Sequence, residues 1–511
     1  MSLPKADVRS PETELAIDHL DADLGRRSRR GGALLLGAQA ARVLGQLATI
    51  VVLARLLPPS AFGLLAMVAA IGLVLDLLKD FGLSSATIQR PDLGQAQISA
   101  LFWINAAAGT GLAALLAVVA PILADFYHQP DLAPVARWLA LGLVMSGLTV
   151  QHWALLRRQM RFAAIAGVET AADYAGFAAA IGLAVASEGY WALVAQRLVT
   201  PAILLIGSWL VCRWRPGRPA AAVGLASLLQ FGTSVTASGL ASALARSFDQ
   251  IMIGWMWGPA LLGLYERTSR LLLLPVNTIN APVYAAGMPA LSRLVGHPDR
   301  YRAMFGQIVQ KLALLTMPVF AVAAVCADWV VEILFGAAWR QAVPLAALFS
   351  LSATFLPVLL TMGLLYLTQD RTGELLRATL IDSFICVLAI AVGLPWGGVG
   401  VAASLTLLGL VLRAPLAFWL ATRRGPVGTL AVWRAIAPAV SAASVAAGAV
   451  WLVRHHVSRE VSVEALAATG AAALLAVMLT LLAWPETRRE MRSAAHRAAV
   501  LVRRRRAFLE P

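Results

Sequence analysis

Long hydrophobic segments, with arginines concentrated in every second junction between them, constrain the fold of this chain more than any other feature. The arginine groups lie within 26–30, 157–161, 213–218, 293–302, 423–434 and 503–506. Only helices or a closed barrel can cross hydrocarbon, because the backbone N–H and C=O groups find no other partners there. The apolar runs are longer than the alternating barrel strands of about ten residues. The sequence therefore predicts an all-α integral membrane protein.

A spanning helix needs about 20 residues, and this length predicts about fourteen transmembrane helices. We place them near 33–56, 61–83, 99–121, 134–155, 165–187, 190–212, 226–248, 259–285, 306–326, 342–366, 376–395, 398–421, 433–453 and 465–484. The even number puts both termini on one side, and the arginine bias makes that side cytoplasmic. The outer junction at 454–459, RHHVSR, is a local exception to this bias.

Composition agrees with a membrane protein and argues against several other classes. The chain is 59% hydrophobic and 14% charged, whereas a soluble domain is about half apolar and a quarter charged. The net charge of +15 is concentrated at segment ends, so membrane lipids are the expected partner and nucleic acid is not. The three cysteines lie far apart, and no P-loop, HExxH or GxSxG motif occurs. We expect no enzyme activity, no metal and no cofactor.

The chain divides into five predicted regions. Residues 1–30 form a polar cytoplasmic leader, and residues 486–511 form a basic amphipathic tail on the inner surface. Residues 31–220 form an N-lobe of six helices, and residues 221–424 form a C-lobe of six. Residues 425–485 add two further transmembrane helices.

An internal repeat relates the two lobes. PSAFGL at 59–64 recurs as PALLGL at 259–264, and ADF at 124–126 recurs as ADW at 327–329. A weaker pair, GYWALVA and GVGVAAS, starts at Gly189 and Gly398. Because six helices lie in each repeat, both halves have the same orientation. This predicts a pseudo-twofold axis along the membrane normal, with a site between the lobes.

Polar residues at membrane depth are the candidate functional residues, because charge inside a bilayer is costly. The first and seventh predicted helices each carry a polar stripe at helical spacing, formed by Gln39, Arg42, Gln46 and Thr49 and by Ser238, Ser242, Arg246 and Asp249. A shift of 200 residues superposes the two stripes. Helix packing is the alternative interpretation, and it explains the serines better than the arginines.

Further charged residues end the second helix and open the eighth. They are Asp76, Lys79 and Asp80, and Glu266 with Arg270. The alternative interpretation places Asp80 at the cytoplasmic interface and makes Glu266 and Arg270 a structural ion pair. An interior richer in arginine than in acid favours an anionic substrate. The predicted substrate cavity comprises Arg42, Gln46, Arg246, Asp249, Arg270, Gln39 and Lys79. The candidate ion-coupling carboxylates are Asp249, Asp76, Asp80 and Glu266.

Several motifs resemble those of the oligosaccharide flippases of the polysaccharide transport family, of the colanic-acid-exporter type. They are DFGLSSATIQR at 80–90, FWIN at 102–105, LRRQMRF at 156–162, FDQIMIG at 248–254 and GLYERTSR at 263–270. The resemblance extends from about residue 34 to about residue 424. It reinforces Asp249 as a candidate. It also assigns Arg90, Arg157, Arg158 and Arg161 to cytoplasmic topology anchors instead of substrate ligands.

This family belongs to the multidrug/oligosaccharidyl-lipid/polysaccharide superfamily. The resemblance implies a V-shaped bundle in the bacterial inner membrane that moves polyprenyl-pyrophosphate-linked oligosaccharide to the periplasmic leaflet by alternating access. The product would serve exopolysaccharide, capsule or O-antigen assembly, with a polymerase and a chain-length regulator as partners and H+ or Na+ as the coupling ion. The alternatives are a cation-coupled drug or metabolite antiporter, a lipid II flippase and a membrane-embedded glycan-modifying enzyme.

Overall fold

The computed structural model describes the backbone of residues 24–80, 84, 87–88, 94–186, 188–218, 225–456, 462–484 and 488. The side chains of 24–36, 38, 40, 77, 80, 225–246 and 463 lie outside the described part. So do the predicted leader up to residue 23 and, apart from Arg488, the predicted tail. The chain forms two compact units, residues 1–267 and residues 268–511, which we describe one at a time.

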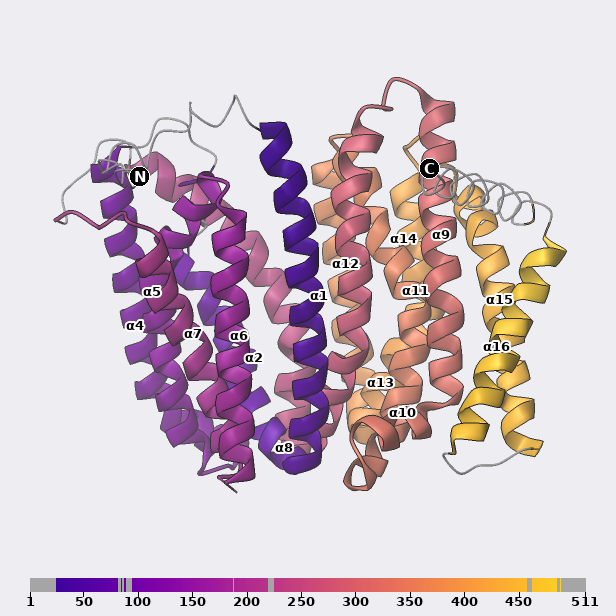
Figure 1. Cartoon of the computed structure of the whole chain (residues 1–511), viewed down its shortest axis with the longest axis horizontal. Coiled ribbons are helices and arrows are strands. Elements are labelled where there is room, and N and C mark those ends of the chain that lie inside the picture. The colour runs from indigo at the N-terminus through magenta and orange to yellow at the C-terminus, as the bar shows by residue number, and fades with distance from the viewer. Residues whose placement is uncertain are drawn as a thin grey trace, which may run out of the picture. The chain divides into compact units, whose positions relative to one another are not determined.

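Unit 1 consists of long helices (Figure 1). They are α1 (Leu24–Leu56), α2 (Pro59–Asp80), α4 (Gln95–Tyr127), α5 (Leu132–Arg158), α6 (Phe162–Val185), α7 (Trp191–Val211) and the first part of α8 (Leu225–Ser292). α1 includes residues 24–30, which the sequence assigned to the leader. α8 is interrupted at Gly258, whose φ of 77° lies in the left-handed region. α8 thus serves as two helices that meet at this glycine.

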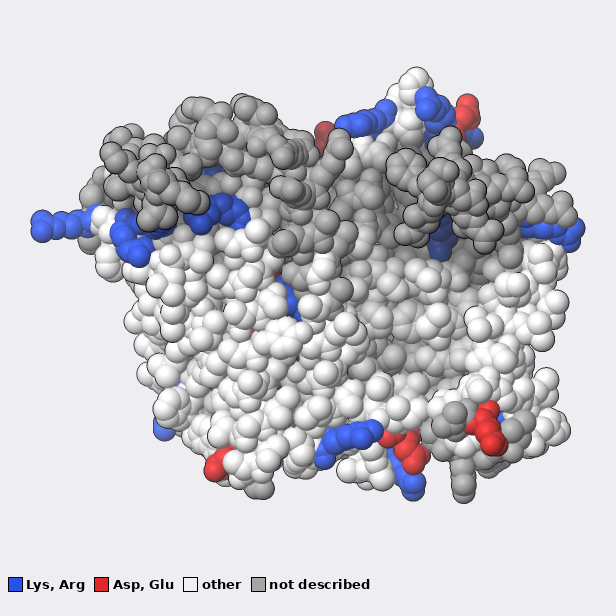
Figure 2. Space-filling model, in the orientation of Figure 1, with Lys and Arg blue, Asp and Glu red and all other residues white. Residues whose placement is uncertain are grey.

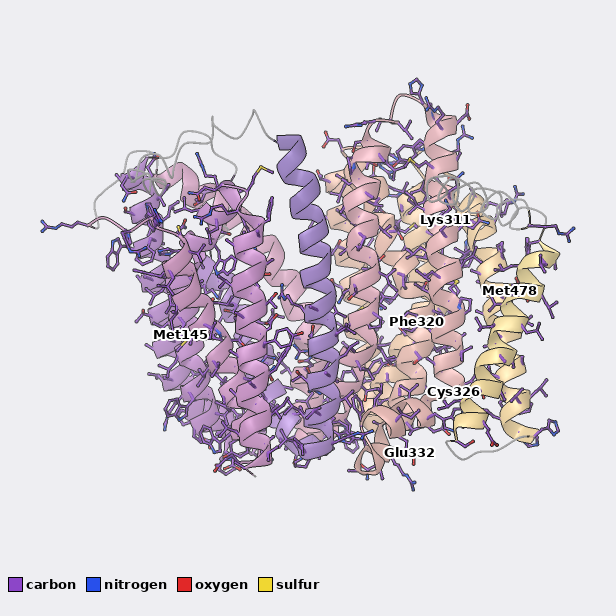
Figure 3. The ribbon with its side chains drawn as sticks, in the orientation of Figure 1. Met145, Lys311, Phe320, Cys326, Glu332 and Met478 are labelled. Atoms are coloured by element: carbon purple, nitrogen blue, oxygen red, sulfur yellow. The ribbon has the colours of Figure 1, made fainter. Side chains whose placement is uncertain are left out.

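Unit 2 begins within α8 and contains the remaining helices. They are α9 (Pro298–Val325), α10 (Ala327–Leu334), η2 (Ala337–Ala342), α11 (Val343–Thr368), α12 (Thr372–Gly393), η3 (Leu394–Trp396), α13 (Gly397–Leu408), the π-helical η4 (Gly409–Arg413), α14 (Ala414–Thr422), α15 (Thr429–His456) and α16 (Val463–Ala483). α15 packs along α9, and α16 packs on α15. Figure 3 shows Lys311, Phe320 and Cys326 in sequence along α9.

The predicted crossings are confirmed over their described residues. Each of the fourteen falls on a helix: the seventh and eighth share α8, and the twelfth comprises α13, η4 and α14. Among the described residues, 11 helical stretches are long and apolar enough to span a membrane. Two of these, Ser247–Ser292 and Thr372–Thr422, have 46 and 51 residues, which is long enough for more than one crossing.

Packing and repeat divide the chain at different residues. The units meet at Arg267, whereas the repeat predicts a division at 220. The difference arises because the part of α8 near Gly254 packs on α2 and on the end of α4: a Cβ on Gly254 would lie 3.0 Å from Tyr127 and 3.3 Å from Met67. The predicted lobe boundaries, which follow from the sequence repeat, stay a prediction.

Two equivalent turns provide structural support for the repeat. Met160 and Asp370 both adopt a left-handed conformation, with φ of 53° and 55°, and each precedes the arginine that begins the next helix. Arg161 Nη1 donates to the carbonyl of Val211, and Arg371 Nη1 donates to the carbonyl of Ala421, in each case 50 residues further on. Arg161, predicted as a topology anchor, therefore also ties two helix ends together.

The third pair of repeated segments, which starts at Gly189 and Gly398, has to be realigned by one residue. Gly189 and Gly397 have φ of 56° and 70°, and each precedes a helix. The sequence comparison paired Gly189 with Gly398. The left-handed glycine that matches it is Gly397, because the backbone conformation of the turn, and not the following small residues, is what both copies share.

Charge is distributed as a membrane-spanning surface requires. On the face shown in Figure 2, the described lysines, arginines and acids lie mainly near the helix ends, and the surface between them is largely uncharged. Arg454, in the junction that breaks the arginine bias, is paired: Nη2 lies 2.5 Å from Asp328 on α10. Nη1 donates to the carbonyl of Val325. A neutralised arginine explains why a cation is tolerated at this junction.

Candidate functional site

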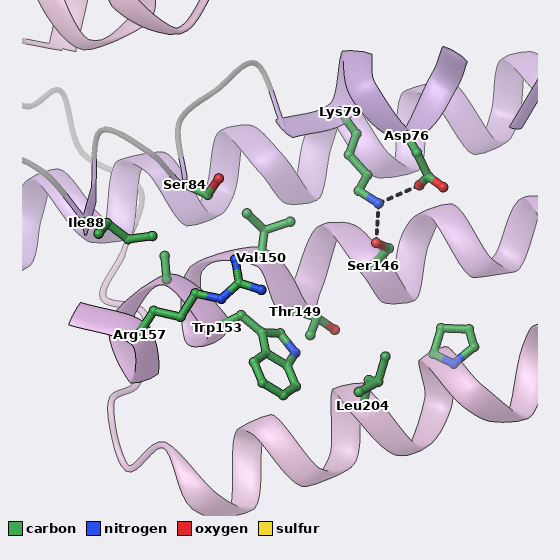
Figure 4. A pocket seen from close by; sticks show the side chains of 12 residues that line it. Asp76, Lys79, Ser84, Ile88, Ser146, Thr149, Val150, Trp153, Arg157 and Leu204 are labelled. Carbon is green, nitrogen blue, oxygen red and sulfur yellow. Dashed lines mark hydrogen bonds and ion pairs between the residues drawn. The ribbon is translucent and has the colours of Figure 1, made fainter. Parts of the chain in front are cut away.

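A cavity of about 330 Å³ lies within unit 1 between α2, α5 and α7 (Figure 4). α2 contributes Asp76 and Lys79, and α7 closes one side with Pro201 and Leu204. The wall from α5 is formed by Ser146, Thr149, Trp153 and Arg157. These four residues follow one another at intervals of three and four, which places them on a single face of the helix.

Lys79 is the buried cation of this cavity. Its side chain is 9% exposed, and its Nζ lies 2.5 Å from Oδ1 of Asp76, whose side chain is 53% exposed. Nζ also donates a hydrogen bond to Oγ of Ser146 on α5 (Figure 4). A buried charge persists only with such partners, and the two contacts fix the ammonium against α5. Lys79 thus lines a cavity within unit 1, and its predicted role in a substrate cavity between the lobes stays a prediction.

Arg157 supplies a second cation to the same cavity. Its side chain extends from the end of α5 into the space between Val150 and Trp153 (Figure 4). The side chain of Arg157 makes no ion pair or hydrogen bond with the part of the chain that the structure describes. Two cations thus face one acid, Asp76, so the described residues of the lining carry a net positive charge. Such a lining attracts an anion.

Arg42, by contrast, is held between two carboxylates of α6. Its Nη1 lies 2.5 Å from Glu169, and its Nε lies 2.7 Å from Asp173. All three side chains are about a quarter to a third exposed. Glu169, which is not among the predicted site residues, is thus an ion-pair partner of one of them. The predicted cavity role of Arg42 stays a prediction, but its charge is more than balanced.

The other predicted site residues are dispersed. Gln39 is exposed, Gln46 is half-buried, and Thr49 bonds the carbonyl of Gly45. Asp249 accepts a hydrogen bond of 2.8 Å from Tyr265 Oη, which closes the Gly258 bend within unit 1. The side chains of Arg246 and Asp80 lie outside the described residues. Glu266 belongs to unit 1 and Arg270 to unit 2, so their pairing stays a prediction.

The sequence analysis did not select Arg157, Ser146 or Arg267 as site residues. The guanidinium of Arg267 lies 4.3 Å from the ring centre of Phe62, and its side chain is buried. A helical-face analysis of 146–157 would have found Ser146 and Arg157, because both share one face with Trp153. Nothing in the sequence marks the contact of Arg267 with Phe62, since it joins two distant helices.

Other proteins resemble this chain in sequence. The lipopolysaccharide biosynthesis protein WzxC of Escherichia coli (strain K12) is 24% identical over 353 residues, 68% of this chain and 71% of WzxC. The teichuronic acid biosynthesis protein TuaB of Bacillus subtilis (strain 168) is 26% identical over 305 residues, 59% of this chain and 61% of TuaB. The matched region is thus less than two thirds of TuaB.

A solved structure agrees in fold. The lipid II flippase MurJ, in an inward closed conformation, superposes with a TM-score of 0.70 over 88% of this chain and 98% of that chain. Its sequence identity of 12% makes this a likeness of fold alone. Residues 52–344, more than half of the chain, match the family described as polysaccharide biosynthesis protein. This multi-pass bacterial membrane protein therefore belongs to that family, which confirms the predicted resemblance to the oligosaccharide flippases.

Proposed function

We propose that the protein moves a polyprenyl-pyrophosphate-linked oligosaccharide from the cytoplasmic to the periplasmic leaflet of the bacterial inner membrane. Both termini are cytoplasmic in this proposal, and the protein transports without catalysing a reaction. The observation that carries the proposal is a cation-lined cavity among membrane-spanning helices in a chain of a polysaccharide biosynthesis family. Its lining supports an anionic cargo, since ammonium and guanidinium groups are the preferred protein partners of phosphate.

The energetics of membrane burial support a functional role for this cavity. Lysine or arginine within a membrane-spanning segment is costly, and it persists chiefly where it lines a pathway or binds a ligand. Lys79, in the last turn of α2, is 9% exposed and shares its cavity with Arg157. Among the described lining residues, Asp76 is the acid that faces these two cations. A drug exporter for cations would need the opposite balance of charge. The antiporter alternative is therefore less well supported at this cavity.

Ion coupling is a separate part of the proposal. H+ or Na+ is the proposed coupling ion, and Asp249, Asp76, Asp80 and Glu266 are the proposed coupling carboxylates. The pair Glu169 and Asp173 joins these candidates, because two acids share the single cation Arg42. An inward gradient would drive outward movement of the cargo if these acids bind the ion. A polysaccharide polymerase and a chain-length regulator are the proposed protein partners.

Reconstitution tests the proposal directly. The full chain is placed in liposomes with a fluorescent oligosaccharide on undecaprenyl pyrophosphate, and a membrane-impermeant glycosidase reports which leaflet holds the sugar. We expect protein-dependent movement of the sugar, accelerated by an H+ or Na+ gradient. In cells, deletion is expected to trap the lipid-linked sugar in the cytoplasmic leaflet. If the sugar stays in place under both gradients and deletion leaves polymer export intact, the proposal is wrong.

A further inference from the structure

We propose that the cavity between α2, α5 and α7 is a phosphate subsite for the diphosphate headgroup of the lipid-linked cargo, in which Lys79 and Ser146 bind one phosphate group and Arg157 binds the other. The identity of this phosphate, as the head of a transported carrier, rests on the proposed function. The site itself stands on the cavity and its donors. Arg157, an exposed residue in the last turn of α5, then has a role beyond topology, because its side chain also meets the ligand.

Unused hydrogen-bond donors converge on this cavity. An ammonium group has three N–H donors, and Lys79 directs two of them to Asp76 and Ser146. The Ser146 hydroxyl accepts from Lys79, so its own proton remains available to a ligand. The guanidinium of Arg157 offers a planar fork of N–H groups that matches two phosphate oxygens. The donors lie at two places along the cavity: Lys79 and Ser146 are in contact, and Arg157 lies 11 residues, about 16 Å, further along α5. This separation suits a diphosphate, whose two phosphate groups can each meet one set of donors.

The size of the cavity limits its occupant to one headgroup. Ligand pockets usually have about 300–1,000 Å³, and this one, at about 330 Å³, is at the small end. A phosphate and its nearest neighbour fit, whereas an oligosaccharide does not. Pro201, Leu204 and Trp153 supply apolar wall, which lowers the local dielectric and strengthens the attraction between a phosphate and the two cations.

The internal repeat does not duplicate the polar lining residues of this cavity. The equivalent turns at Arg161 and Arg371 lie 210 positions apart, and that shift places Leu356 and Leu367 opposite Ser146 and Arg157. The shift of 200 that relates Gly63 to Gly263 places Ile279 opposite Lys79. The polar lining thus occurs in one copy of the repeat, which a binding role confined to that half explains.

Binding of a prenyl pyrophosphate tests the subsite without requiring transport. The full chain is placed in phosphatidylcholine nanodiscs, and the affinity for farnesyl pyrophosphate is compared with that for farnesol, which has the same tail and no phosphate. We expect farnesyl pyrophosphate to bind and farnesol not to bind. Each of Lys79→Met and Arg157→Gln should weaken binding by roughly tenfold or more, since a charged hydrogen bond contributes about 1.5–3 kcal/mol. Arg157→Lys should retain part of the affinity.

Matched controls separate this site from a general effect of charge. Arg213→Gln removes an exposed arginine that does not line the cavity, and it should leave binding unchanged. Thermal unfolding of each variant verifies folding, and Arg157→Gln remains informative if Lys79→Met fails to fold. Equal affinity in wild type, Arg157→Gln and Arg213→Gln would overturn the subsite.

A lipid headgroup is the other source of phosphate. Nanodiscs that contain phosphatidylglycerol should leave farnesyl pyrophosphate binding intact, and displacement by that lipid would overturn the assignment to cargo. The binding assay and the transport assay can give different answers. If binding depends on Lys79 and Arg157 but the protein moves no oligosaccharide, the subsite is supported and the proposed function is contradicted. The two proposals can thus fail independently.

Discussion

Gly63 and Gly263 lie in a reciprocal backbone contact. A Cβ on Gly63 would lie 1.7 Å from the carbonyl oxygen of Pro259, and a Cβ on Gly263 would lie 1.8 Å from the carbonyl oxygen of Pro59. Each glycine thus leaves room for the backbone at the start of the other motif. The two copies of the repeated motif therefore pack on each other within unit 1. Small residues are common where membrane helices pack closely. Here the helices are so close that only glycine, which has no Cβ, fits at either position.

We predict that Gly63→Ala destabilises the protein and impairs transport. The new methyl group would overlap backbone, which cannot move aside as a flexible side chain does, so the helices must separate. Overpacking of this kind costs about 1–3 kcal/mol or more. The measurement is the midpoint of thermal unfolding of purified protein, together with polymer export in a deletion strain.

Gly72→Ala is the matched control, because it lies on the same helix and a Cβ there meets nothing within 4 Å. This substitution should be neutral or stabilising by about 0.5–1 kcal/mol, since alanine favours a helix. Equal behaviour of the Gly63 and Gly72 variants would contradict the close contact.

A second prediction concerns the bend in α8. Gly258 has φ of 77° and ψ of −178°, a conformation that is essentially restricted to glycine. Gly258→Ala should therefore cost about 1–3 kcal/mol of stability by backbone strain alone, although a Cβ there meets nothing within 4 Å. Gly448→Ala, at an equally open helical position, should show no loss of thermal stability. A Gly258→Ala protein as stable as this control would be evidence against the bend.

The helices could be predicted from the sequence, whereas the partners of the charged residues could not. Bilayer thickness sets helix length, so each apolar run indicates its own crossing. Arg42 meets Glu169 and Asp173 at separations of 127 and 131 residues, which depend on how α1 packs on α6. The match between Gly63 and Gly263 was visible as a repeat, but symmetry alone does not reveal that two copies touch. Arg157 was assigned to topology because its position along the chain does not show the cavity beside it.

The ion pairs of Arg42 lead to a third prediction. Arg42→Gln leaves Glu169 and Asp173 without their cation, so it should lower stability by about 1–3 kcal/mol, a range reduced for partial exposure. The triple variant Arg42→Gln, Glu169→Gln, Asp173→Asn removes all three charges and should recover most of that stability. Thermal unfolding of both variants provides the comparison.

Polymer export in the same variants distinguishes structure from transport. If the triple variant regains stability and export, Arg42 acts as a structural ion pair and its cavity role is wrong. If stability returns and export does not, the charges themselves take part in cargo binding or ion coupling. No difference in stability between the single and triple variants would contradict the ion pairs.

Arg454 and Asp328 provide the fourth prediction, at the end of unit 2 where α15 meets α10. Their atoms lie 2.5 Å apart, the arginine side chain is 13% exposed, and its guanidinium lies 4.6 Å from the ring centre of Trp329. A double-mutant cycle with Arg454→Met and Asp328→Asn should give a coupling energy of about 1–2 kcal/mol, because the arginine is largely shielded from water while Asp328 is 43% exposed. Arg340 and Glu332 are the internal control: they lie 4.0 Å apart and are 73% and 47% exposed. Their cycle should give less than about 0.5 kcal/mol, as exposed ion pairs do. Similar coupling in both cycles would show that α15 is not held at α10 by this pair.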